Sequence, residues 1–168
     1  LKDDRYLIKR INVPDMKEEA FVGNIDNYST NLKFELSHVD FPGFPLETDS
    51  TTWEDVSKSI YEVDSFGSEL ARSNYFEDDL NSLLNGINNP EEKVSRIFSY
   101  VVNKMTWNNY TSYYTNEGVK EAYKKGSGNV ADINLILVAM LRKANLNADP
   151  VLISTKDHGM PLFPTRNG

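Results

Sequence analysis

The most informative part of the sequence is residues 126–146, which read GSGNVADINLILVAMLRKANL. Apolar residues occupy nearly every side of a predicted helix over Val130–Lys143, which is typical of a helix that is buried on several faces. Asn129 caps this helix and Asp132 is its third residue, so an acidic side chain lies at the positive helix end. Asn145 can adopt the left-handed conformation that ends a helix. The stretch therefore predicts a central helix.

Two further helices are predicted upstream of the central one. Residues 89–92, Asn-Pro-Glu-Glu, combine a cap, a proline at the first position and carboxylates in the first turn. Apolar residues then recur at core-facing helical spacing at Val94, Ile97, Phe98, Val101, Val102 and Met105. The same spacing occurs at Phe76, Leu80, Leu83, Leu84 and Ile87. We expect both stripes to lie in the core. The helix that begins after Asn89 is expected to extend from Glu91 to Trp107.

Strand patterns flank the helical part. Leu32, Phe34 and Leu36 alternate with polar residues, which indicates a half-buried strand, and residues 6–13 form a less regular candidate. Because two strands cannot form an independent sheet, we interpret them as the last strands of a β-rich domain. Residues 150–154 predict a buried strand after the central helix. The predicted class is α+β, a helical half-core with a small sheet.

The segment 41–45, Phe-Pro-Gly-Phe-Pro, is typical of a boundary between modules. We therefore predict strands of a β-rich domain and a linker over residues 1–46, and a second, mainly helical domain over residues 47–168. A chain of 168 residues is long enough to bury a real core.

Composition excludes several classes of protein. The net charge of −7, from 18 basic and 25 acidic residues, argues against nucleic acid as a partner. No apolar run is long enough to span a bilayer, so membrane insertion is not expected. The chain has no cysteine, which excludes disulfides, thiolate metal sites and a cysteine nucleophile.

Candidate ligand-binding and catalytic side chains are few. Trp107, Tyr110, Tyr113 and Tyr114, together with Tyr123, could stack on a sugar or a peptide, although core packing would also explain them.

The two histidines, His38 and His158, lack metal-ligand spacing, so neither a metal nor another cofactor is predicted. His158 could be a general base or part of a solvated turn. The loop at 126–128 could bind an anion, but it lacks the lysine of a nucleotide-binding loop.

Residues 126–134, the helix after them and the predicted strand 149–154 resemble the papain-like core of the transglutaminase-like superfamily. In that family a Gly-x-Cys-x-Asp-type start opens a buried helix that ends in an LRxxGI-like stretch. Residues 141–146, Leu-Arg-Lys-Ala-Asn-Leu, look like that helix end, with Asn145 in place of the usual glycine.

The amino-terminal part carries a second resemblance. Residues 12–21, 25–28 and 34–36 are similar to the end of the DUF3857 module, which precedes transglutaminase-like domains in many bacterial exported proteins. This resemblance implies a bacterial protein that is periplasmic or secreted.

The chain departs from the family at the catalytic positions. Val130 occupies the position of the nucleophilic cysteine, and an isopropyl group cannot attack an acyl carbon. Asp132 matches a frequent acidic position, although capping also accounts for it. His158 follows the first predicted strand, whereas the family histidine lies on a later one, so that role is not transferred to His158. On this alignment residues 162–168 stop just short of where the family's His strand would begin, so we expect neither acid-base partner within these 168 residues.

The resemblance and the lost cysteine together suggest a catalytically degenerate transglutaminase-like module. Such a module would bind a peptide, a glycan or a cell-wall fragment, or act as a scaffold. The alternatives are a hydrolase or acyltransferase of the same fold with a Ser or Thr nucleophile, and a structural spacer without a ligand. If later strands are missing, the free edge of the strand at 150–154 should also favour strand-mediated self-association of this fragment.

Overall fold

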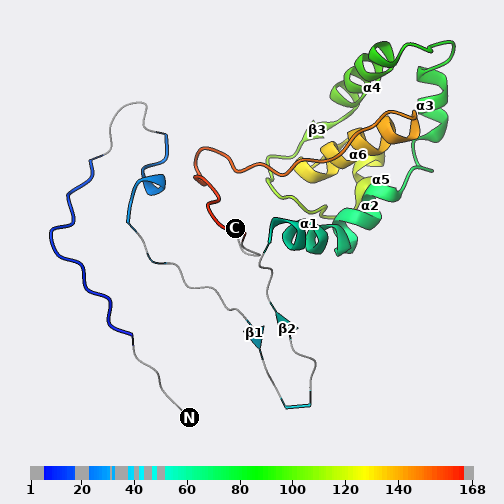
Figure 1. Ribbon diagram of the computed structural model, residues 1–168. Coiled ribbons are helices and arrows are strands. Elements are labelled where there is room, and N and C mark those ends of the chain that lie inside the picture. Colours follow the sequence, from blue (N-terminus) through cyan, green and yellow to red (C-terminus); the bar gives the residue numbers. More distant parts are fainter. Residues whose placement is uncertain are drawn as a thin grey trace. The chain divides into compact units, whose positions relative to one another are not determined.

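The computed structural model describes residues 6–17, 23–30 and 52–164, and between them positions 32, 38, 39, 42, 43, 47 and 48. The chain divides into two units, and the larger one contains the helices labelled in Figure 1. One contains residues 1–35 and 154–162, and the other contains residues 36–153 and 163–168. The larger unit is mainly helical with small two-stranded sheets, which agrees with the predicted α+β class.

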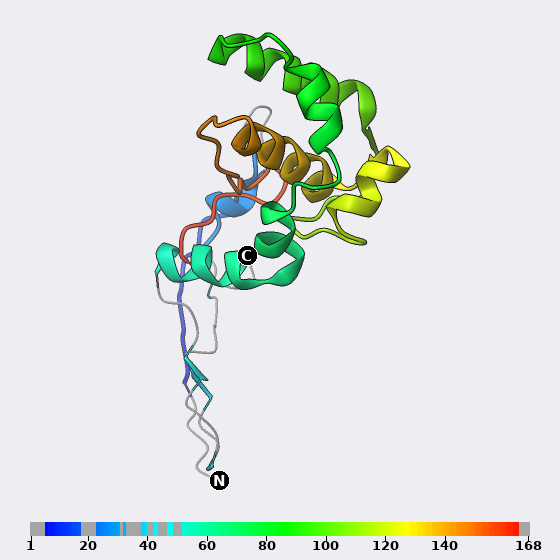
Figure 2. The same cartoon turned by 90° about the vertical axis from the view of Figure 1, so that its right-hand side faces the viewer.

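Helices form most of the larger unit. In chain order they are α1 (Trp53–Glu62), the π-helix η2 (Asp64–Ser68), α2 (Glu69–Ala71), α3 (Glu77–Leu83), α4 (Pro90–Lys104), α5 (Val119–Lys125) and α6 (Val130–Lys143). α6 packs against α2, α4 and α5, and Figure 2 shows it lying between α4 and α2. It is therefore the central helix that the sequence predicts. No described helix is long and apolar enough to cross a membrane.

The start and end of α6 confirm the sequence prediction. The Asn129 side chain accepts a hydrogen bond from the Asp132 N–H at 2.8 Å, and the Asp132 carboxylate accepts one from the Asn129 N–H at 2.9 Å. This reciprocal capping box satisfies two N–H groups that a helix start leaves free. After the helix, Asn145 has a φ of 62°, the expected left-handed conformation.

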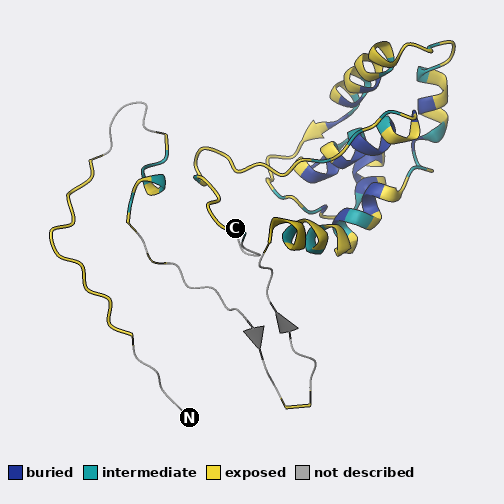
Figure 3. Ribbon diagram, viewed as in Figure 1, coloured by how far each residue is buried: buried dark blue, intermediate teal, exposed yellow. Residues whose placement is uncertain are grey.

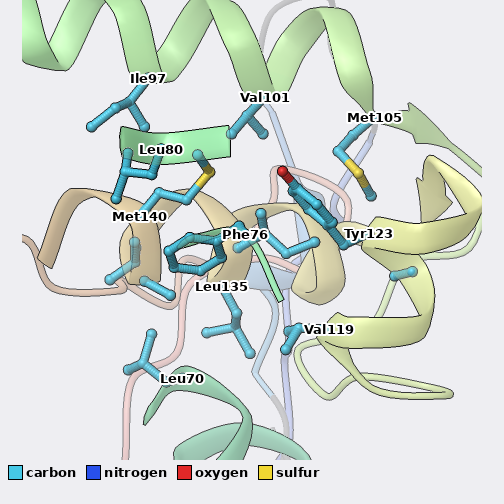
Figure 4. Packing of buried hydrophobic residues seen from close by; sticks show 14 of the residues in the cluster. Leu70, Phe76, Leu80, Ile97, Val101, Met105, Val119, Tyr123, Leu135 and Met140 are labelled. Carbon is cyan, nitrogen blue, oxygen red and sulfur yellow. The ribbon is translucent and has the colours of Figure 1, made fainter. Parts of the chain in front are cut away.

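The hydrophobic core lies between α6 and its neighbours. Figure 4 shows side chains from several helices meeting there, including Leu70 of α2, Phe76 and Leu80 at α3, Ile97 and Val101 of α4, and Leu135 and Met140 of α6. All of these side chains are buried. Burial of this apolar surface is the main force that holds the helices together.

The apolar stripe predicted for α4 is only partly in the core. Ile97, Val101 and Met105 are buried, whereas Val94, Phe98 and Val102 are 45%, 55% and 57% exposed. The exposed three recur every fourth residue, so they form an adjoining face that no described element covers (Figure 3). The helix also ends at Lys104, earlier than predicted.

The second stripe is confirmed in its first half. Phe76 and Leu80 are buried, and Leu83 and Leu84 pack partly against the core. Ile87 lies beyond the end of α3, which closes at Leu83.

A polar cluster joins α3, α4 and α5. Asp79 accepts hydrogen bonds from the Tyr100 and Tyr123 hydroxyls at 2.8 and 2.5 Å. The bond from Tyr123 lowers the pKa of the Asp79 carboxyl most, followed by the bond from Tyr100. Burial raises this pKa by less than either bond lowers it, and the Lys104 charge lowers it further, so the pKa lies below its usual value. Burial and the bond to Asp79 raise the pKa of Tyr123, so the phenol stays protonated.

Two short sheets occur in the larger unit. β1 (His38–Val39) and β2 (Glu47–Thr48) pair antiparallel, with His38 opposite Thr48. Pro42 and Gly43 lie in the turn of this hairpin, so the predicted boundary segment 41–45 lies between two paired strands. β3 (Thr106–Trp107) and β4 (Ser127–Gly128) pair parallel, which places the residues after α4 beside the start of α6.

Other strand predictions are wrong or lie outside the described residues. Residues 6–13 and 150–154 form no strand, and all of them are exposed except Pro150, which is half-buried. Both segments contain β-branched residues, which favour extended backbone. A strand also needs a hydrogen-bonded partner, and no described strand pairs with either segment. Leu32 is 58% exposed, and Phe34 and Leu36 lie outside the described part of the chain.

The smaller unit is held together by asparagine side chains. Asn24 caps the short helix η1 (Ile25–Asn27) and donates from Nδ2 to the Asp157 carbonyl at 2.9 Å. Asn27 Oδ1 accepts from the Met160 N–H at 2.6 Å. These bonds connect two segments that are distant in sequence.

Candidate ligand-binding site at the start of helix α6

The loop 107–117 is joined to the first turn of α6 through one carbonyl. The Tyr110 carbonyl accepts a hydrogen bond from the Val130 N–H at 3.3 Å and another from the Trp107 indole Nε1–H at 3.0 Å. The two bonds bring Trp107 and Tyr110 to the helix start. Two residues predicted to bind ligand are therefore connected to Val130, the residue that the resemblance aligns with the family nucleophile.

A second set of contacts fixes the far end of the same loop. The buried Asn129 side chain donates from Nδ2 to the Tyr114 carbonyl at 2.9 Å. The Thr115 N–H and hydroxyl both donate to the Ser65 carbonyl of η2, each at 2.9 Å. The loop is thus held at one end by the start of α6 and at the other by α6 and η2. Because these contacts fix its backbone, its side chains are preorganised.

Three aromatic side chains of the loop and the side chain of Val130 are exposed. Trp107 is 49% exposed, Tyr110 58%, Tyr113 39% and Val130 37%. We call these four residues the aromatic platform. Amphipathic rings of this kind can stack on a ligand and offer a polar edge to it.

Tyr114, the fourth aromatic candidate, differs from the others. Its ring packs partly against the core and lies 4.3 Å, centroid to centroid, from the ring of Tyr113. Its main role is therefore to pack against the Tyr113 ring, and it contributes little exposed surface.

The chemistry available at Val130 is limited. Its side chain has no nucleophilic atom, and its backbone N–H is already hydrogen-bonded to the Tyr110 carbonyl. A backbone N–H at such a place could otherwise stabilise the oxyanion of an acyl-transfer intermediate. Both parts that acyl transfer would need at this residue are therefore missing.

Asp132 is buried on the opposite side of the helix start. The side chain is 3% exposed, and its Oδ1 atom has no hydrogen-bond partner among the described residues. Burial raises the pKa of this carboxyl, and the charges of Glu69 and Glu117 add to the effect. The N–H of Asn129 opposes it through a hydrogen bond. The N–H of Asn116 also lowers the pKa, although it is not placed for a well-formed bond.

A small pocket adjoins Asp132. Its volume is about 150 Å³, and it is lined by Asn108, Asn116, Glu117, Ala122, Lys125, Ser127, Gly128 and Asp132. Lys125 forms an ion pair with Glu117, and both side chains are 55% exposed, so the pair lies at the rim. Gly128 is required here because a Cβ atom on it would lie 2.6 Å from that of Asp132. The sequence pattern did not reveal this pocket, since its charged residues come from separate segments.

Among the described residues, no histidine lines the pocket. His158 is exposed in the smaller unit, and its Nδ1 atom lies 2.7 Å from the Thr155 hydroxyl within a single turn. The side chain of His38 lies outside the described residues. Within the described ranges, no three His, Asp or Glu side chains are grouped as metal ligands would be.

Comparison with known proteins supports the resemblance at the level of the domain. A family model described as the transglutaminase-like superfamily matches residues 79–161, from α3 to beyond α6. The chain therefore contains a transglutaminase-like domain, and the aromatic platform and the pocket both lie within its matched residues. Searches of curated proteins and of solved structures found no match. The DUF3857-type module upstream and the bacterial origin stay predictions.

Proposed function

We propose that this chain is a catalytically degenerate transglutaminase-like module that binds its ligand at the aromatic platform. The domain match supplies the family. The observation that supports the proposal is the double hydrogen bond at the Tyr110 carbonyl, which connects the exposed Trp107 and Tyr110 to Val130, the residue that the resemblance aligns with the nucleophile. Such a surface is suited to hold a ligand without reacting with it. The ligand classes are a peptide, a glycan or a cell-wall fragment.

The proposal also covers the place and the partners of the protein. Because its amino-terminal part resembles the DUF3857 module of many bacterial exported proteins, we propose that it acts in the periplasm or outside the cell. The apolar residues Val151, Leu152 and Ile153, which are 80%, 57% and 76% exposed, support strand-mediated self-association of this fragment.

Binding assays with the two tryptophans provide a matched test. Trp107→Ala should weaken binding of a peptide or peptidoglycan fragment about tenfold, because it removes a large stacking surface. Trp53→Ala is the control, since Trp53 lies in α1 and is 47% exposed. Equal affinities for the two variants would contradict the platform as the binding site.

The second candidate function is a hydrolase or acyltransferase with a hydroxyl nucleophile. The observation that favours it is the 2.7 Å contact between the Thr155 hydroxyl and His158, which is within the reach of a general base. Thr155→Ala and His158→Ala should then abolish amide or ester hydrolysis. Hydrolysis at the uncatalysed rate by the unmodified protein would rule this candidate out.

A further inference from the structure

The pocket beside Asp132 has an excess of negative charge and of hydrogen-bond acceptors. Two carboxylates line it, and within the described part of the chain only the one on Glu117 has a cation, Lys125, within ion-pairing distance. Asp132 forms no ion pair with any described residue, and its buried Oδ1 atom has no hydrogen-bond partner. A buried carboxylate without a counter-ion is costly, so the pocket favours a cationic, donor-rich guest.

The size of the pocket narrows the choice of guest. A volume of about 150 Å³ suits a small guest. A planar guanidinium group with part of its stem fits within that volume. It also offers five N–H donors, which can bind a carboxylate and amide oxygens at the same time. Asn108, Asn116 and Ser127 also line the pocket, and their side chains carry amide and hydroxyl oxygens, of which Asn108 Oδ1 already accepts a hydrogen bond from the Tyr110 N–H.

We infer that this pocket binds a guanidinium group and that Asp132 is its anionic partner. This inference rests on the proposed binding function and specifies the ligand chemistry. The loop 107–117 carries both the aromatic platform and the pocket residues Asn108 and Asn116. An arginine-containing peptide can therefore place its guanidinium in the pocket while the rest of the chain lies on the platform. A free guanidino compound shares the same chemistry and would fill the pocket alone.

Titration with methylguanidinium, followed by the backbone N–H signals of Asn116, Gly128 and Asn129, tests the pocket without the platform. Methylurea is the matched neutral probe of the same shape. We expect saturable shifts with methylguanidinium and none with methylurea. Equal shifts with both probes, or no shift with either, would overturn the inference.

Three variants should change the affinity for methylguanidinium, two by lowering it and one by raising it. Asp132→Asn should lower methylguanidinium affinity about tenfold or more, because a charged hydrogen bond is lost. Glu117→Gln should weaken binding by freeing the Lys125 charge at the rim, and Lys125→Met should strengthen it. Because the rim side chains are 55% exposed, these two variants keep the fold even if Asp132→Asn does not. An unchanged affinity in both rim variants contradicts the assignment.

A pair of peptides separates the inference from the proposed function. An arginine-containing peptide should bind at least about tenfold more tightly than the same peptide with citrulline, which is neutral. If both peptides bind equally and Trp107→Ala weakens both, the platform binds ligand and the guanidinium assignment is wrong. If methylguanidinium binds but neither peptide does, the pocket serves a free guanidino compound and the proposed peptide function fails.

Discussion

Two residues in the first turn of α6, Val130 and Asp132, lie on opposite sides of the helix and differ in almost every property. Val130 is 37% exposed and belongs to the aromatic platform, whereas Asp132 is 3% exposed and completes the capping box. The fold therefore depends on Asp132 and uses only the backbone of Val130. This difference is what the proposed function requires, because a change of the side chain at residue 130 then leaves the capping box of the helix in place.

The contrast continues along the helix and predicts the largest effect. Ile136 is on the same side as Asp132 and is fully buried, whereas Asn134 is on the same side as Val130 and is exposed. Ile136→Ala should lower the free energy of unfolding by about 2–5 kcal/mol, because it leaves a cavity in the core. Asn134→Ala should change it by less than about 0.5 kcal/mol. Urea denaturation measures both, and similar losses would contradict the assignment of the two faces.

The next effect compares two helix caps. Asn129→Ala removes the cap of α6 and also the bond from Asn129 Nδ2 to the Tyr114 carbonyl. Asn89→Ala removes only the exposed cap of α4. Loss of a cap costs about 0.5–2 kcal/mol, so we expect Asn129→Ala to lie above that range and Asn89→Ala within it. Equal losses in urea denaturation would show that the loop 107–117 gains no stability from Asn129.

Two carboxylates should respond to pH with opposite signs. The folded-state pKa of Asp132 is raised above 3.8, so the folded state binds more protons than the unfolded state. Stability attributable to Asp132 therefore falls as pH rises above about 4. The folded-state pKa of Asp79 is lowered from 3.8, so its contribution is present above that value and is lost as pH falls below it.

Unfolding free energies measured from about pH 3 to pH 7 test this difference. The stability of Asp132→Asn relative to the unmodified protein should rise with pH, and that of Asp79→Asn should fall. Parallel curves for the two variants would be inconsistent with their different environments.

The smallest structural effect is expected at Val130 itself. Val130→Cys should change the free energy of unfolding by less than about 0.5 kcal/mol, because the side chain is partly exposed. The helix N-terminus should lower the pKa of the new thiol below that of a free cysteine, which alkylation rates measured against pH will report. Amide hydrolysis and amine transfer should stay at background, since the N–H of residue 130 is bound to the Tyr110 carbonyl. Restored acyl transfer would show that the site is intact apart from its nucleophile.

How far the sequence predicted the fold depends on where each signal originates. α6 was predicted to the residue, because its cap, its apolar sides and Asn145 are all local features. The stripe on α4 predicted a helix correctly but not which of its apolar residues are covered, since Phe98 is 55% exposed. The prediction of a strand at 150–154 was wrong because strand pairing depends on a segment that is distant in the sequence.

The candidate site shows the same limit. Tyr110 and Trp107 stood out in the sequence as aromatic residues, but their meeting at Val130 depends on a carbonyl whose position no pattern reveals. Asp132 was recognised as a cap, whereas its unpartnered Oδ1 atom and the neighbouring Glu117 are visible only after folding.

The central claim, that the start of α6 binds a ligand without reacting with it, is tested most directly by the two indole N–H signals of the protein. The chain has only two tryptophans, and Trp107 Nε1–H is bonded to the Tyr110 carbonyl at the platform. During titration with an arginine-containing peptide, the account predicts that the Trp107 signal shifts, the Trp53 signal stays, and dilution reverses the change. An irreversible change in the Trp107 signal, or a shift confined to Trp53, would contradict it.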